Sequence, residues 1–87
     1  VSKGGIIQLT RWMSTVLAPD IRVNCVSPGG VARNQPQVFV DKYVARTPLK
    51  RMGEEDDFKG AVLYFSSDVS AWVTGQNLIV DGGWSAW

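Results

Sequence analysis

The first part of the chain places its apolar residues with the period of an α-helix. Between residues 5 and 17 they recur at steps of three and four positions, at Ile6, Leu9, Met13, Val16 and Leu17. This spacing predicts a helix with these side chains on one, core-facing side. Ile7 and Trp12 widen the apolar surface, which predicts packing on two sides or against a partner chain. Pro19 and Asp20 are expected to end the helix.

Two short segments are predicted to be strands. Residues 21–26 (IRVNCV) and 77–81 (NLIVD) are β-branched and mostly apolar, which is typical of strands covered on both faces. Breaker residues follow each of them, at 27–30 (SPGG) and 82–83 (GG). A four-residue tail that holds two tryptophans comes last.

The region between the strands has two parts. Residues 31–53 have no clean period, which predicts a long loop with one or two helical turns around 37–45. Residues 54–67 predict a second helix, because acidic residues fill its first turn and Phe58, Ala61, Val62 and Phe65 form an apolar stripe. Gly60 costs this helix about 1 kcal/mol against alanine and suggests a close approach to another backbone.

The predicted order is helix, strand, loop, helix, strand, which indicates an α/β fold. A strand–helix–strand unit is expected to be parallel with a right-handed crossover. Two parallel strands are not stable alone, since such sheets are normally buried on both faces. We therefore expect an exposed edge on the first strand that more sheet or a second copy covers.

Composition excludes several classes of protein. A chain of 87 residues fits one small domain, and a net charge of +1 argues against a nucleic-acid or membrane-surface protein. The basic residues Lys42, Arg46, Lys50 and Arg51 are followed by the acidic run 54–57, which cancels much of their field. One apolar cysteine, Cys25, and no histidine exclude an intrachain disulfide and predict no metal site. With no signal peptide and no apolar stretch of about 20 residues, we expect a cytoplasmic protein.

Four motifs in this order resemble those of the short-chain dehydrogenases/reductases. Residues 2–5 (SKGG) are similar to the second half of the family's Tyr-x-x-Ser-Lys-(Ala/Gly)-(Ala/Gly) signature. Residues 21–24 (IRVN) running into 27–29 (SPG) resemble its sixth strand and cofactor loop. Residues 63–68, 73–76 and 80–83 resemble its last helix and last strand. The resemblance covers nearly the whole chain and implies the C-terminal part of a Rossmann-type doubly wound parallel sheet.

The resemblance also implies that residues 1–87 are one partial domain, the C-terminal third of a dinucleotide-binding oxidoreductase. The signature tyrosine would fall two places before Val1. The family's phosphate-binding Gly-rich turn, its ribose-reading residue and its catalytic serine and asparagine have no counterpart in these residues. We therefore expect the chain alone to lack catalysis of its own.

The resemblance assigns a catalytic role to Lys3. In the family this ammonium binds the nicotinamide ribose hydroxyls and lowers the pKa of the tyrosine phenol from about 10 towards the working pH. The loop Pro28, Gly29, Gly30 and Val31 would bind the cofactor, with the main chain of Val31 on the nicotinamide carboxamide. Arg33 stands where the family often has threonine, and could instead reach a cofactor phosphate or a substrate carboxylate. An ordinary surface arginine explains this residue equally well.

Residues 34–52 correspond to the family's substrate loop, where Phe39, Val40 and Tyr43 are candidate pocket walls. Packing of a short amphipathic helix explains these three residues equally well. The cofactor would be NAD or NADP, and the substrate a small alcohol or carbonyl compound. The four tryptophans, at 12, 72, 84 and 87, are typical of exposed interface aromatics. The resemblance implies a homo-oligomer, because the helix after the signature lysine and the last helix and strand form subunit interfaces in the family.

Two hypotheses remain open from the sequence. In the first, the chain is part of an oxidoreductase that transfers a hydride between nicotinamide and a carbonyl or alcohol carbon. In the second, it is a non-catalytic α/β structural fragment that associates with itself through its tryptophans and its exposed strand edge.

Overall fold

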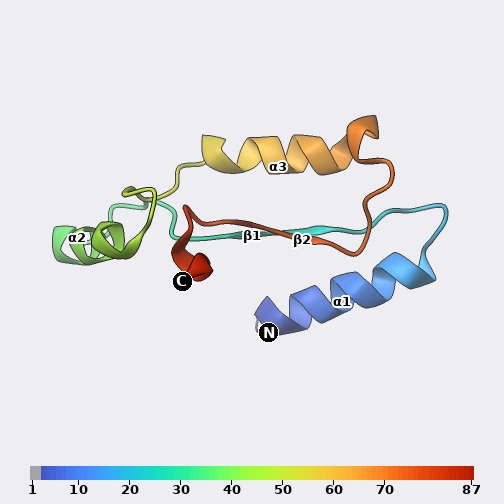
Figure 1. Cartoon of the computed structure of the whole chain (residues 1–87), viewed down its shortest axis with the longest axis horizontal. Coiled ribbons are helices and arrows are strands. Elements are labelled where there is room, and N and C mark those ends of the chain that lie inside the picture. The colour runs from blue at the N-terminus through green and yellow to red at the C-terminus, as the bar shows by residue number, and fades with distance from the viewer. Residues whose placement is uncertain (1–2) are drawn as a thin grey trace.

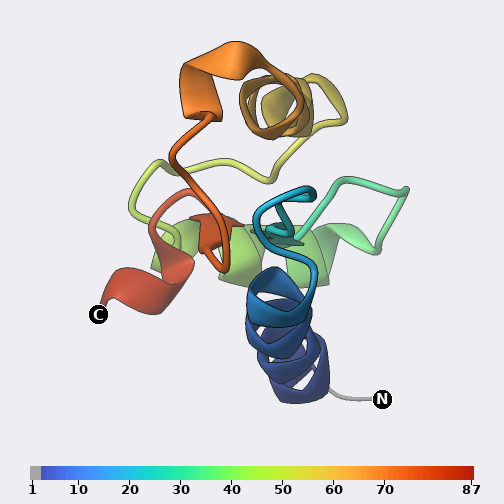
Figure 2. The same ribbon diagram turned by 90° about the vertical axis from the view of Figure 1, so that its right-hand side faces the viewer.

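Two parallel strands, β1 (Cys25–Pro28) and β2 (Asn77–Val80), form the sheet, with Cys25 paired to Asn77 and Pro28 to Val80. The computed structural model describes residues 3–87, and side chains from residue 4. Helix α1 (Lys3–Val16) covers one face of the sheet and α3 (Asp56–Ser66) the other (Figures 1 and 2). The predicted α/β arrangement with parallel strands is confirmed.

The remaining elements gather mostly at one end of the sheet. Helix α2 (Gln37–Arg46) lies beyond the carboxyl ends of the strands (Figure 1). Two short 3₁₀ helices occur at Asp68–Ser70 and Trp84–Ala86, the second in the C-terminal tail beside α2. Parallel α/β sheets bind ligands at this carboxyl edge.

Strand β1 is shifted from its predicted range. The ladder begins only at Cys25, because side chains take the backbone donors before it: Val23 N–H bonds the Thr74 hydroxyl and Gln76 N–H bonds Asn24 Oδ1, each at 3.0 Å. It continues through Pro28, where the sequence predicted a break. Cys25 N–H donates to the Gln76 carbonyl just before β2, and Gly29 N–H donates to the Val80 carbonyl. Because alternate residues face the partner strand, the missing donor of Pro28 falls on the other edge.

Helix α1 turns a different face to the sheet from the predicted one. Its buried residues are Thr10 and Ser14, while Ile6, Leu9 and Val16 are more than half exposed. Ser14 Oγ lies 2.8 Å from where a Cβ on Gly75 would stand, so the helix approaches the chain too closely there for a large side chain. Both buried hydroxyls bond carbonyls of their own helix, Thr10 to Ile6 at 2.8 Å and Ser14 to Arg11 at 2.6 Å, which removes the cost of burying them.

Helix α3 follows its predicted stripe with two differences. Ala61 is buried and Phe58 and Phe65 are half-buried, but Val62 is 55% exposed. Gly60 has no heavy atom within 4 Å of the place where a Cβ would stand, so the close approach suggested for it is not found in this chain.

Arg22 connects the end of α3 to the start of β1. Its guanidinium donates to the carbonyls of Phe65 and Ser67, at 3.0 and 3.3 Å, and to the Ser70 hydroxyl at 3.0 Å. A cation at a helix C-terminus can bind carbonyls that have no partner within the helix, and its charge interacts favourably with the negative end of the helix dipole.

The chain has little apolar core of its own. Among the described residues only Met52 and Ala61 are buried hydrophobic side chains. The Cα radius of gyration is 15.1 Å, whereas a compact domain of this length has about 12 Å. The outer faces of α1 and α3 are therefore open to another part of a protein or to a second copy.

Candidate functional site

The loop after β1, residues 29–33, is fixed at the carboxyl edge of the sheet. Gly29 N–H donates to the Val80 carbonyl at 2.9 Å, which extends the ladder by one bond. Gly53 then brackets the loop, since its N–H donates to the Gly30 carbonyl at 2.8 Å and its carbonyl accepts from Ala32 N–H at 2.9 Å. The loop that the resemblance assigns to the cofactor therefore has a defined backbone.

These two bonds determine where the polar groups of Val31 point. In an extended segment, alternate residues present their N–H and C=O groups on opposite sides, so those of Val31 face away from Gly53. The Val31 carbonyl accepts the Gln35 side-chain amide at 2.8 Å, and Gln35 Oε1 accepts Arg33 N–H at 2.7 Å. Within the described part of the chain, the Val31 N–H has no hydrogen-bond partner. The loop thus holds one primary carboxamide and offers a further backbone donor beside it.

Gly29 and Gly30 are required by contacts inside the chain. A Cβ on Gly30 would stand 2.6 Å from Tyr43 Cζ, and one on Gly29 would stand 2.6 Å from Asp81 Cβ. The resemblance assigns these glycines to the cofactor-binding loop. In the structure, Tyr43 and Asp81 already fill the space in which a side chain at these two positions would lie.

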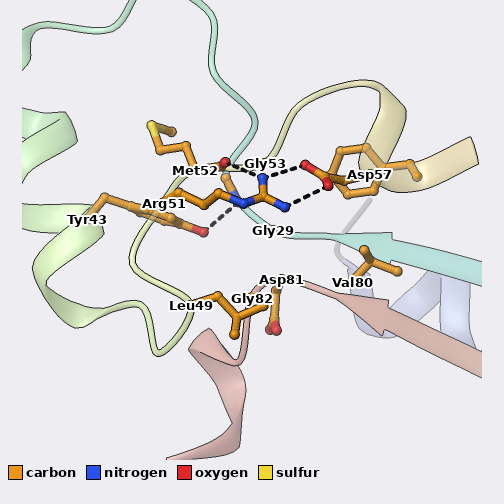
Figure 3. Close-up of a pocket in the computed structure, with 12 residues that line it drawn as sticks. Gly29, Tyr43, Leu49, Arg51, Met52, Gly53, Asp57, Val80, Asp81 and Gly82 are labelled. Atoms are coloured by element: carbon orange, nitrogen blue, oxygen red, sulfur yellow. Dashed lines mark hydrogen bonds and ion pairs between the residues drawn. The ribbon is translucent and has the colours of Figure 1, made fainter.

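Tyr43 joins the loop to α2 and to the C-terminal tail. Its hydroxyl accepts Gly30 N–H at 2.6 Å (Figure 3). Its ring stacks on Trp84 with 4.5 Å between centroids and 8° between planes. The guanidinium carbon of Arg46 lies 5.1 Å from the centre of the Trp84 ring. Trp84 is half-buried in this contact, so the expectation that all four tryptophans are exposed is wrong for this one.

Asp81 fixes the start of the tail. Its carboxylate accepts the amide N–H groups of Gly83 at 2.9 Å and Ser85 at 3.1 Å. The Ser85 hydroxyl and then these amides hold the pKa of Asp81 below its ordinary value, against a partial loss of solvation. The carboxylate is therefore charged at neutral pH and serves the turn.

Of the other two predicted pocket walls, Phe39 and Val40, only Phe39 has a ring contact with Tyr43. Val40 lines an open hollow of about 510 Å³ that Ala32, Gln35 and Met52 also line. Phe39 is 50% exposed, with its ring centre 6.1 Å from that of Tyr43.

Arg33 pairs with an acidic residue instead of standing free. Its Nη2 lies 3.2 Å from Glu55 Oε1, and its Nη1 donates to the Ala32 carbonyl at 2.8 Å. Both charged side chains of this pair are more than half exposed to solvent. Such a pair is weak and can open to admit an anionic group.

A smaller cavity of about 150 Å³ lies between the loop and α3, lined by Gly30, Gly53 and Arg51 among others (Figure 3). Arg51 donates to both Asp57 oxygens, at 2.7 and 2.8 Å. Arg51, and next the N–H of Glu54 at 2.7 Å, hold the pKa of Asp57 far below its ordinary value. The pair ties the end of the segment 34–52 to the first turn of α3.

Lys3 begins α1, but its side chain lies outside the described residues, so its predicted catalytic role stays a prediction. Residues 3–87 contain no cluster of metal-ligating side chains. None of the helices described is both long and apolar enough to cross a membrane.

Sequence reasoning missed two residues of this site, Gln35 and Gly53. A glutamine in a loop has no distinctive signal, and its bond to Val31 depends on the fold of the loop. Gly53 stands just before the acidic run, which was a possible signal of a turn. Nothing in the sequence pattern indicated that its backbone would pair with that of Val31.

Comparisons with known proteins agree with this geometry. Residues 1–85 match the family described as Enoyl-(Acyl carrier protein) reductase. A short-chain dehydrogenase from Leptospira borgpetersenii, solved with bound NAD+, superposes with a TM-score of 0.93 at 48% identity, over 95% of this chain and 33% of that one. A gluconate 5-dehydrogenase from Burkholderia cenocepacia, in complex with NADP and tartrate, gives 0.92 at 33% identity, over 98% and 36%. D-arabinitol 2-dehydrogenase from Candida tropicalis is 38% identical over all of this chain and 34% of its own length.

The chain belongs to the short-chain dehydrogenase/reductase family, as its motifs indicated. It spans about a third of the length of the curated relatives that it matches. The cofactor expectation is confirmed for the family, since solved relatives hold NAD+ or NADP.

Proposed function

We propose that residues 1–87 form the nicotinamide-binding and substrate-covering part of an NAD(P)-dependent oxidoreductase that acts on an alcohol or carbonyl group. The observation that carries this proposal is the arrangement of Val31. Its N–H faces away from Gly53, at the carboxyl edge of a parallel sheet, without a partner in the described chain. A backbone donor in this place suits the carboxamide oxygen of a nicotinamide.

Gln35 supports the fit of that group. Its side chain is a primary carboxamide, the same chemical group that nicotinamide carries, and the loop already binds it through Val31 and Arg33. The backbone at residues 31–33 is therefore suited to recognise a carboxamide. Bound nicotinamide would supply or accept the hydride.

The chain's own residues would orient the cofactor and cover the substrate. Pro28, Gly29, Gly30 and Val31 would hold the nicotinamide end, and Lys3 would bind ribose hydroxyls and favour ionisation of a neighbouring phenol. Arg33 would exchange Glu55 for a phosphate or carboxylate of a ligand. Phe39, Val40 and Tyr43 would belong to the segment that covers the substrate.

Residues 1–87 would form one partial domain, completed by a phosphate-binding portion of the kind that the family resemblance implies. The exposed apolar faces favour assembly as a homo-oligomer, because Trp12, Trp72 and Trp87 are 62, 100 and 85% exposed. The lone Cys25 suits a reducing compartment, so we place the protein in the cytoplasm. The same exposed faces also favour the second hypothesis, a self-associating fragment without catalysis.

A chimaera separates the two functions. In it, residues 1–87 replace the matching third of the Leptospira dehydrogenase. Saturable binding of NADH by the chimaera supports the cofactor-binding role. A folded chimaera that does not bind NADH supports a purely structural role.

A further inference from the structure

Tyr43 is held in place from two sides. On its main-chain side, the fully buried Thr47 donates its hydroxyl to the Tyr43 carbonyl at 2.7 Å. On its ring side, Trp84 stacks at 4.5 Å, and Trp87 Nε1 donates to the Arg46 carbonyl at 3.1 Å. Helix α2 and the C-terminal tail therefore fix the position of the Tyr43 hydroxyl.

That hydroxyl acts on the most adaptable part of the loop. Two consecutive glycines, Gly29 and Gly30, can adopt many backbone conformations, because neither has a Cβ. The hydrogen bond from Gly30 N–H to the Tyr43 hydroxyl, at 2.6 Å, selects the orientation of the peptide group that joins Gly29 to Gly30. The next peptide is planar and carries both the Gly30 carbonyl, bound to Gly53, and the Val31 N–H. The direction of the Val31 N–H thus depends on two anchors, Gly53 and Tyr43.

We propose that Tyr43 is a positioning residue for nicotinamide, which acts through the Gly30 amide, and that the C-terminal tail takes part in the cofactor site through Trp84. This inference rests on the proposed function, because it assumes that Val31 meets the carboxamide. It gives Tyr43 a task different from that of a substrate-pocket wall. It also gives the tail a task besides association between subunits.

The first measurement examines the Gly30 bond without a cofactor. The chain is labelled with glycine that carries both a ¹³C carbonyl and ¹⁵N. A glycine ¹⁵N then shows one-bond coupling to a ¹³C carbonyl only where the preceding residue is also glycine. These amides belong to Gly5, Gly30 and Gly83. Tyr43→Phe keeps the ring and its stacking and removes the acceptor. We expect one of the three amide protons, that of Gly30, to move upfield and to exchange roughly 2- to 10-fold faster.

The second measurement uses NADH binding by the chimaera. Tyr43→Phe is expected to raise the dissociation constant about 3- to 10-fold, which is the value of one hydrogen bond. The melting temperature should change little, since the stack on Trp84 remains. Trp84→Leu should weaken binding in the same direction, and the double variant should lose less than the two single effects combined, because both act through the same hydroxyl. Hydrogen exchange of residues 26–33 in the chimaera repeats the first measurement in a larger protein.

Tyr64→Phe is the matched control. It makes the same chemical change on α3, at a tyrosine that is 42% exposed and whose hydroxyl has no hydrogen bond within the described chain. It should leave the Gly30 amide and NADH binding unchanged.

The outcomes separate this inference from the proposed function. If the unmodified chimaera binds NADH and Tyr43→Phe binds it equally well, the positioning role is wrong while the proposed function stands. An unchanged Gly30 amide in Tyr43→Phe overturns the inference as well. If the unmodified chimaera folds without binding NADH, the proposed function fails and the inference about nicotinamide fails with it.

Discussion

The side-chain amide of Gln35 donates to the Val31 carbonyl at 2.8 Å, on the side of the loop that faces away from Gly53. The carbonyl therefore has its donor from within the chain, while the neighbouring Val31 N–H has no partner among residues 3–87. A carboxamide that approaches this edge would find a free donor and an acceptor that is already engaged.

This asymmetry predicts which atom of the nicotinamide carboxamide matters. The reduced 3-acetylpyridine analogue of NADH keeps the carbonyl oxygen but lacks the amide nitrogen. We expect the chimaera to bind this analogue within about threefold of NADH, since Gln35 already occupies one acceptor site of the Val31 carbonyl, whereas the Val31 N–H needs only the carbonyl oxygen that the analogue keeps. Fluorescence titration of both dinucleotides measures the ratio. A loss of more than tenfold would contradict this expectation, because it would mean that the nicotinamide amide nitrogen also has an acceptor in the site.

The Arg51–Asp57 pair predicts a pH dependence of stability. Its geometry lowers the pKa of Asp57 below the unfolded value of about 3.9. A lowered folded-state pKa stabilises the protein fully above the unfolded value and less as pH falls through the folded one. Asp57→Asn should therefore lower the melting temperature at pH 7, and the difference from the parent should shrink below about pH 4.

Circular dichroism melts at pH 7 and pH 3 measure this difference. Asp20→Asn removes an exposed carboxylate that forms no ion pair among the described residues, and it should have little effect at either pH. A difference for Asp57→Asn that is as large at pH 3 as at pH 7 would contradict the assigned role of the carboxylate.

Gly60 gives a test of packing on α3. No heavy atom lies within 4 Å of the place where its Cβ would stand. Gly60→Ala should therefore raise the free energy of unfolding of the chain by about 0.5–1 kcal/mol, the helix propensity difference. Urea denaturation measures it. Loss of stability would mean that another surface packs closely on this position, as the sequence suggested.

Periodicity and breakers were enough to predict the layers of the fold. The acidic start of α3 and the parallel pairing of the strands depend on local pattern or on the handedness of the crossover. Around residues 37–45 the pattern predicted only one or two helical turns in a long loop, whereas the structure has the ten-residue helix α2. The face of α1 could not be predicted in the same way. Burial of Thr10 and Ser14 depends on Gly75, which lies far along the sequence and allows a close approach that favours small side chains over large apolar ones.

The candidate site was predictable in location and not in its contacts. The motif at residues 28–31 indicated the loop, and strand order placed it at the ligand-binding edge. The hydrogen bond between Tyr43 and Gly30 joins a side chain to a backbone amide, so it leaves no residue pattern that a sequence could reveal. The stack on Trp84 is likewise a consequence of how the tail folds back, and an aromatic residue near a chain end resembles an interface residue until its neighbour is known.

The most direct test of the central claim is a fluorescence titration of NADH into the chimaera, with the unmodified Leptospira dehydrogenase measured beside it. We expect saturable binding within about tenfold of that dehydrogenase, and weaker binding when Lys3 is changed to methionine. A chimaera that melts cooperatively but shows no saturation with NADH would contradict the assignment of residues 1–87 to the nicotinamide site.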